Sequence, residues 1–116
     1  MNHYRNGRAN EYRIRDDLER YNYECVRAAG SKGKADLIAM RPGEVLLVQV
    51  KASNPQLPPA ERVDLLAMAS RSGALPLVAY KPARRPVVYR TLLGPGPKEW
   101  EPWTPSPTLA TSLADV

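Results

Sequence analysis

Apolar side chains recur along residues 7–21 at the spacing of one helical face. Ile14, Leu18 and Tyr21 are four and three residues apart, which predicts a helix over this range with these side chains facing the core. Glu11 extends the same stripe three residues before Ile14, whereas the other charged residues of the helix lie mainly off it. The pattern therefore predicts a carboxylate on the interior side of this helix.

Two nearly continuous apolar runs follow, at 35–40 and 44–51. The segment RPGE joins them, and Pro42-Gly43 suits the central positions of a type II turn, which predicts a hairpin. Continuous apolar strands indicate burial on both faces, with another layer above and below. Further strands are predicted at 23–28, 75–81 and 86–92.

A second helix is predicted over 59–72. Pro58 and Pro59 suit its start, and Gly73 suits the position just beyond its end. The element order α-β-β-β-α-β-β predicts a mixed α/β fold with a central five-stranded sheet. We assign residues 1–93 to this domain, and 94–116, which are rich in proline, to an irregular C-terminal tail.

Composition narrows the possible chemistry. The chain has 116 residues, enough for one small domain, with one cysteine and one histidine, which excludes a His/Cys zinc cluster. The N-terminus has no apolar signal segment, and no stretch is long enough to span a membrane. We therefore expect a soluble cytoplasmic domain whose chemistry depends on carboxylates, amides, lysines and arginines.

Charge points to a polyanionic partner. The formal net charge is +5, the sequence pI is about 9.6, and the excess of Lys and Arg lies within residues 1–93. Nucleic acid is the first expectation. An anionic membrane surface is a distant alternative, because neither helix divides into one basic and one apolar side.

The hairpin brings polar groups together. If the turn is centred on Pro42-Gly43, Asp36 lies opposite Gln49, and Lys51 projects from the same face two residues further on. Burying these groups without partners would cost several kcal/mol. A structural role alone does not require three polar groups at this position.

Such a cluster suits metal-dependent hydrolysis of a phosphodiester. Asp36 offers a carboxylate, Gln49 an amide oxygen and Val50 a backbone carbonyl, which are the oxygen donors that Mg²⁺ accepts. A bound metal polarises the phosphoryl group and lowers the pKa of a bound water. Lys51 is suited to orient that water or stabilise developing negative charge. Glu11, on the interior side of the first helix, is placed to add a second carboxylate.

The same residues resemble a nuclease signature. Asp36, Gln49 and Lys51, in the order D-(12 residues)-Q-V-K, resemble the PD-(D/E)XK nucleases with an amide at the central acidic position. The wider pattern resembles the archaeal-type Holliday junction resolvases and their phage relatives. It consists of NGRANE at 6–11, VRAAGSKG at 26–33, ADLIA at 35–39 and VQVK at 48–51.

This resemblance covers residues 5–92 and implies a restriction-endonuclease-like core. It also implies a homodimer that cuts four-way (Holliday) junctions with Mg²⁺ or Mn²⁺, with no organic cofactor and no membrane. The implied metal and catalytic set is Glu11, Asp36, Gln49 and Lys51, and Arg27 and Ser31 match residues used near the scissile phosphate. The chain departs from the pattern at Gln49, which carries no charge, and at Ala35, where the motif has proline.

Other basic residues form a candidate DNA-contacting surface. We include Arg8, Lys32, Lys34 and Lys81, the last of which ends a strand near the same sheet edge. Two alternatives remain open. The first is another nuclease of this fold that cuts flaps, mismatched duplex or a specific site. The second is a non-catalytic junction-binding module in which Gln49 marks a decayed metal site.

Overall fold

The computed structural model describes residues 3–28 and 35–107, with side chains from residue 8 onward. Six strands form one sheet in sequence order, in which β3 and β4 are parallel and all other neighbours are antiparallel. The elements are α1 (His3–Glu19), β1 (Glu24–Arg27), β2 (Leu37–Arg41), β3 (Glu44–Lys51), α2 (Pro59–Ser72), β4 (Leu75–Tyr80), β5 (Val88–Leu92) and β6 (Trp100–Trp103).

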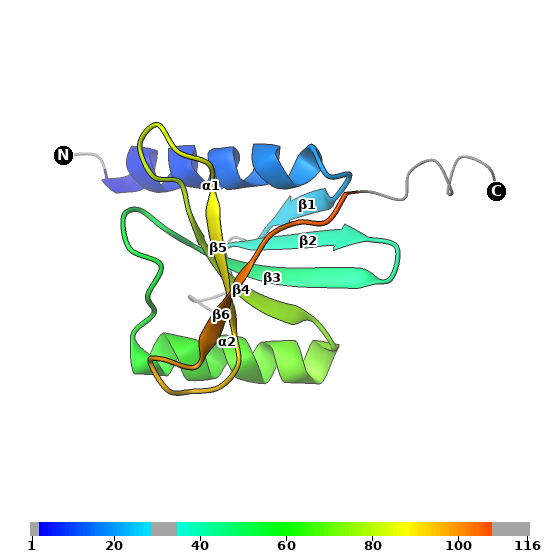
Figure 1. Ribbon diagram of the computed structural model, residues 1–116, viewed down its shortest axis with the longest axis vertical. Helices are drawn as coiled ribbons and strands as arrows, with labels where there is room; N and C mark the ends of the chain where they lie inside the picture. The colour runs from blue at the N-terminus through cyan, green and yellow to red at the C-terminus, as the bar shows by residue number, and fades with distance from the viewer. Residues whose placement is uncertain (1–2, 29–34, 108–116) are drawn as a thin grey trace.

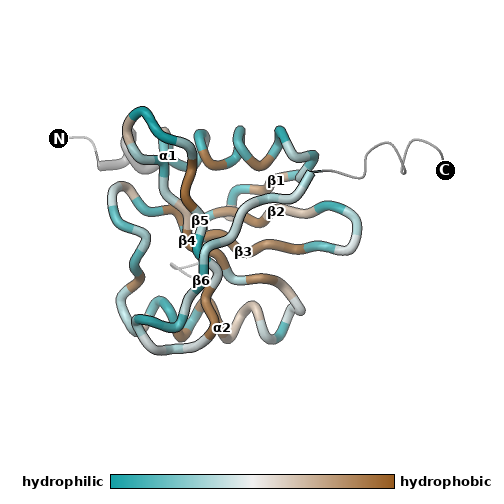
Figure 2. Tube along the Cα trace, in the orientation of Figure 1, coloured by the Kyte–Doolittle hydropathy of each residue, from teal (hydrophilic) through white to brown (hydrophobic). Residues whose placement is uncertain are grey.

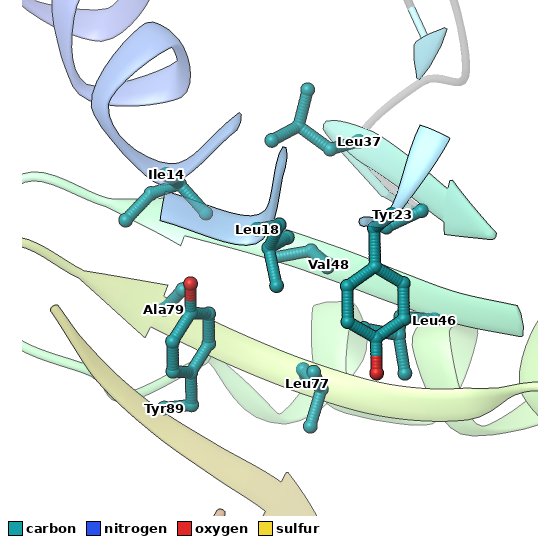
Figure 3. Close-up of a cluster of buried hydrophobic side chains, with 10 residues drawn as sticks. Ile14, Leu18, Tyr23, Leu37, Leu46, Val48, Leu77, Ala79 and Tyr89 are labelled. Carbon is teal, nitrogen blue, oxygen red and sulfur yellow. The ribbon is translucent and has the colours of Figure 1, made fainter. Parts of the chain in front are cut away.

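The two helices cover opposite faces of the sheet, with α1 above it and α2 below it in Figure 1. Ile14 and Leu18 of α1 are fully buried, and Figure 3 shows them lying over Val48 of β3. The periodicity that predicted this helical face is confirmed. The mixed α/β fold is confirmed as well.

A second cluster fills the other face. Leu65 and Ala69 of α2 pack there with Leu47 of β3 and Val78 of β4. Apolar residues accordingly follow the central strands in Figure 2, whereas the connecting segments are more polar. The strand β3 is buried on both faces, as its continuous apolar sequence predicted.

The helix α2 connects the parallel strands β3 and β4. It begins with Pro59 after Pro58, and it ends at Gly73, whose φ of 68° is left-handed, as expected from the sequence. A helix that returns the chain between parallel strands runs antiparallel to them. The first turn of α2 therefore follows the end of β3 at which Gln49 and Lys51 lie.

Residues beyond Gly94 were predicted to be irregular, and this prediction is wrong for residues 100–103. They form β6, which makes the sheet six-stranded and pairs with β5. Proline density favoured an irregular segment, but an edge strand tolerates proline, and Pro102 lies in this one. Trp100 and Trp103 are three residues apart, so they face opposite sides of the sheet, one packed against each core cluster.

Smaller differences concern element ends. The helix predicted to reach Tyr21 ends at Glu19, and the chain turns at Asn22, whose φ is 66°. The strand predicted over 35–40 begins at Leu37 instead, for a reason that involves Asp36. Within the described part of the chain, we find no helix that is long and apolar enough to cross a membrane.

Candidate active site

The β2–β3 hairpin has the predicted register over most of its length. Its pairs run from Arg41↔Glu44 to Leu37↔Val48, and Gly43 at the turn has a φ of 76°. This φ is the left-handed value that a type II turn requires at its third residue.

The expected pair of Asp36 with Gln49 does not form. The backbone N–H of Asp36 donates to the carbonyl of Val48 at 2.8 Å, and Val48 is the residue that pairs with Leu37. Two consecutive residues of one strand facing a single residue of the other is the pattern of a β-bulge. The bulge shifts Asp36 out of the regular pairing, so the predicted alignment of Asp36 directly opposite Gln49 is wrong, although its carboxylate still interacts with Lys51 of β3.

The Asp36 carboxylate instead takes the place of a backbone acceptor. Its Oδ2 accepts the N–H of Val50 at 2.8 Å, and its own carbonyl accepts the N–H of Ala28 at 2.9 Å. Asp36 is therefore held between β1 and β3 by both its main chain and its side chain.

Burial and neighbouring charges act on this carboxylate. Desolvation raises the pKa of Asp36, and the hydrogen bond from Val50 opposes the rise. The charges of Glu11 and Glu61 raise the pKa further, whereas Lys51 lowers it. Asp36 therefore interacts electrostatically with side chains from α1, β3 and α2.

Gln49 and Lys51 meet at a third residue. Both point to the α2 side of β3, where Gln49 Nε2 donates to Glu61 Oε1 at 3.3 Å and Lys51 Nζ donates to the same oxygen at 3.2 Å. Gln49 is only 6% exposed, and its Oε1 is buried without a hydrogen-bond partner within the described residues.

Glu11 lies on the other side of the sheet and forms an ion pair. Arg27 Nε donates to Glu11 Oε1 at 2.7 Å, and the Glu11 side chain is 17% exposed. The position of Glu11 near the interior is as the sequence predicted. Its carboxylate, however, contacts an arginine that we had expected to contact DNA.

The donors at this end of β3 fit a hard divalent cation. They are the Asp36 carboxylate, which accepts the Val50 N–H, and the amide oxygen of Gln49, which has no hydrogen-bond partner among the described residues, and both are oxygen ligands. Among the described residues, no three His, Cys, Asp or Glu side chains lie close enough together to hold a metal. Any metal at this position therefore depends on the amide as well as on carboxylates.

Comparisons with known proteins identify the family. A sequence model of the archaeal Holliday junction resolvases (Hjc) matches residues 2–93. The chain belongs to the Hjc family.

One curated relative and one solved structure are similar to the chain. The chain is 45% identical over 51 residues to the crossover junction endodeoxyribonuclease Hjc of Methanocaldococcus jannaschii, an alignment that spans 44% of this chain and 38% of the relative. The solved structure of Archaeoglobus fulgidus Hjc, a Holliday junction resolvase from an archaeal hyperthermophile, superposes with a TM-score of 0.62 at 21% identity. This superposition covers 70% of this chain and 73% of that one, and it shows the shared fold. The Hjc family belongs to a superfamily of metal-dependent nucleases.

The structure separates the basic residues expected to bind DNA in this Hjc chain. Arg8 and Arg27 line one small depression of about 20 Å³ with Glu11 and Arg15. Lys81 lies elsewhere and donates from Nζ to the carbonyl of Pro82 at 2.9 Å. Ser31, Lys32 and Lys34 lie outside the described residues.

Glu61 is the site residue that we did not predict. The sequence pattern indicated charged neighbours of Asp36 only in the hairpin and the first helix. The parallel connection β3–α2–β4 contained the missing signal, because it places the first turn of the helix at the end of β3. A carboxylate in that turn, two residues after Pro59, is the feature that a topological argument would have found.

Proposed function

We propose that this chain is a metal-dependent endonuclease that resolves four-way DNA junctions by hydrolysing phosphodiester bonds as a homodimer. The observation that carries the proposal is the arrangement at the end of β3. There a bulge positions Asp36, while Gln49 and Lys51 lie on either side of Val50 in β3, and Gln49 Oε1 has no hydrogen-bond partner in the part of the chain that the structure describes. Membership of the Hjc family supports the choice of substrate. The chain spans little more than a third of its curated Methanocaldococcus relative, so activity, substrate and partner belong to this proposal.

The reaction is an in-line displacement at phosphorus. A water oxygen forms a bond to phosphorus, the bond to one sugar oxygen breaks, and that oxygen leaves with a proton. A bound Mg²⁺ or Mn²⁺ supplies Lewis-acid polarisation of the phosphoryl group and a more acidic water. The residues that would hold it are Asp36, Gln49 and the main chain at Val50.

The remaining residues bind and orient. Lys51 is the cation of the site, and its ammonium orients the attacking water or balances the negative charge that grows on the phosphoryl oxygens. Arg8 and Arg27, in one depression beside Glu11, contact backbone phosphates. Glu11 holds Arg27 in place through their ion pair. These contacts carry no base readout, so we expect little sequence preference.

Exposed apolar side chains support the homodimer. The strand pairing places Val26, Met40 and Val45 on one face of β1, β2 and β3, and they are 48%, 37% and 36% exposed. Large apolar side chains exposed together on one sheet face are typical of an interaction surface. Two copies would present two active sites to two strands of a junction. We place this reaction in the cytoplasm of a prokaryotic or phage-infected cell.

The test compares a labelled four-way junction with a flap and a linear duplex of matched sequence, in Mg²⁺. Wild type and the control Asp64→Asn, which removes an exposed carboxylate of α2, should nick the junction alone, and Asp36→Asn should not. Cutting of flaps or linear duplex at equal rates would replace the proposal with another nuclease of this fold.

A second candidate is a non-catalytic junction-binding module. The uncharged Gln49 favours it, since a neutral ligand attracts a cation less strongly than a carboxylate. Junction binding that does not respond to Mg²⁺ or Mn²⁺, with no cleavage by wild type in either, would establish this module instead.

A further inference from the structure

The amide at position 49 and the carboxylate at position 61 lie together. Gln49 Nε2 is 3.3 Å from Glu61 Oε1, and Lys51 Nζ is 3.2 Å from the same oxygen. Glu61 therefore brings negative charge from α2 to the position where the strand β3 lacks it. Asp36 lies close enough to Glu61 for the two carboxylates to interact electrostatically.

Gln49 is oriented so that its oxygen has no protein partner among the described residues. Gln49 is 6% exposed, and among the described residues its Oε1 accepts no hydrogen bond, although its Nε2 donates one to Glu61. A buried acceptor left unpaired destabilises the folded state. A cation bound beside Oε1 removes this cost, so the amide orientation is itself an indication of a ligand.

We propose that Glu61 is a metal ligand of this site and supplies from α2 the carboxylate that Gln49 lacks in β3. The ligand set is then Asp36, Glu61 and Gln49 Oε1, which combines two carboxylates with one amide oxygen. The inference rests on the proposed function, because it concerns the same metal. Under this inference, Gln49 does not mark a decayed metal site. It binds the metal together with Glu61, which provides the carboxylate from α2.

The competing role for Glu61 is purely structural. In that role it is an ion-pair partner that holds the Lys51 ammonium and contributes nothing to a metal. The Lys51 and Glu61 side chains are 25% and 36% exposed, and a pair exposed to this degree contributes little to stability. Glu61→Gln should therefore fold, and its metal affinity distinguishes the two roles.

The experiment measures Mn²⁺ binding by isothermal titration calorimetry on metal-stripped protein without DNA. Glu61→Gln should weaken binding by about tenfold or more, because even residues that only support metal ligands contribute about 10–100-fold. The matched control is Asp64→Asn, which removes an exposed carboxylate one turn along the same helix and should bind as wild type does. Urea unfolding in EDTA verifies that each variant is folded.

The decisive variant exchanges the two groups. Glu61→Gln combined with Gln49→Glu restores one carboxylate and one amide in swapped positions, and it should recover most of the affinity that Glu61→Gln loses. A structural partner of Lys51 predicts no such recovery of Mn²⁺ binding, because affinity would not have been lost.

Two results would overturn the inference, and they differ. If Asp36→Asn abolishes Mn²⁺ binding while Glu61→Gln binds as Asp64→Asn does, Glu61 is not a ligand and the proposed nuclease stands. If neither Asp36→Asn nor Glu61→Gln weakens binding, the metal does not occupy this site, and both the inference and the proposed function are wrong.

Discussion

Arg27 of β1 donates a 2.7 Å hydrogen bond from Nε to Oε1 of Glu11 in α1, and so joins the first helix to the strand beside Asp36. The ion pair balances one of the two negative charges that raise the pKa of Asp36. The Arg27 side chain is 43% exposed, so solvent reaches it although it is paired with Glu11. A phosphate can therefore reach Arg27 while Glu11 fixes its position.

Arg27→Gln should weaken junction binding in EDTA and lower the slope of log affinity against log salt by about one. Each phosphate contact made by a cation releases condensed counterions, which gives a slope of about −0.9 per contact on duplex DNA. The control is Arg71→Gln, at an exposed position in the last turn of α2. Equal salt slopes for the two variants, measured by fluorescence anisotropy, would show that Arg27 contacts no phosphate.

Asp36 should make the metal-free protein less stable at neutral pH. Burial raises the pKa of Asp36 in the folded state above 3.8, so folding favours the protonated carboxyl. The contribution of this protonated carboxyl to the free energy of unfolding is fully present below pH 3.8. This contribution is lost as the pH rises through the raised folded pKa. Asp36→Asn, which keeps an acceptor for the Val50 N–H, should therefore be more stable than wild type at pH 7 in EDTA, and the difference should vanish at acidic pH.

Metal should reverse this order. A ligand that binds the folded state alone stabilises it by about 2.7 kcal/mol at a hundred times its Kd. Mn²⁺ should therefore raise the free energy of unfolding of wild type and leave Asp36→Asn unchanged, as measured by urea titration. An Asp36→Asn variant that is less stable than wild type at pH 7 in EDTA would contradict the raised pKa of Asp36 in the folded state.

The exposed face of β1–β3 should mediate the dimer. Met40→Lys places a charge among Val26 and Val45 on that face, and we expect it to shift the protein towards monomer in light scattering after size exclusion. Leu93→Lys is the control, because Leu93 is 61% exposed and lies outside this face. A dimer that survives Met40→Lys as it does Leu93→Lys would place the interface elsewhere.

The strand β6 should contribute to stability. The Trp103 ring packs edge-on against Tyr89, with ring centroids 5.2 Å apart, and it borders the core under α1. Trp103→Ala should lower the free energy of unfolding by about 2 kcal/mol, since it removes an aromatic pair and part of the packed surface. Leu93→Ala, at an exposed position, should change it by less than about 0.5 kcal/mol. Equal effects would mean that β6 is not part of the folding unit.

Periodicity predicted the elements that bury one face or both. The spacing of Ile14 and Leu18 predicted the buried face of α1, and the apolar run in β3 predicted a central strand. Both predictions succeed because buried side chains recur with the period of the helix or strand backbone. Pattern did not predict β6, because an edge strand needs little apolar sequence and tolerates Pro102. Trp100 and Trp103 contained the signal, since two large aromatics three residues apart suit the two sides of one strand.

The candidate site was predictable in its residue types and less so in its geometry. The hairpin register placed Asp36 near Gln49 and Lys51, but the bulge at Asp36 depends on one backbone hydrogen bond to Val48 that no side-chain pattern indicates. Glu61 was missed because its distance along the chain from the hairpin hides a contact that arises from the parallel crossover.

The most direct measurement of the central claim uses a supercoiled plasmid that extrudes a cruciform. Two symmetric incisions in one binding event convert it to linear DNA, whereas single incisions give nicked circles. We expect wild type in Mg²⁺ to produce linear plasmid without an accumulating nicked form, and Asp36→Asn to produce neither. Nicked circles as the only product, or equal cutting of a plasmid without the cruciform, would contradict the account of a dimeric junction resolvase.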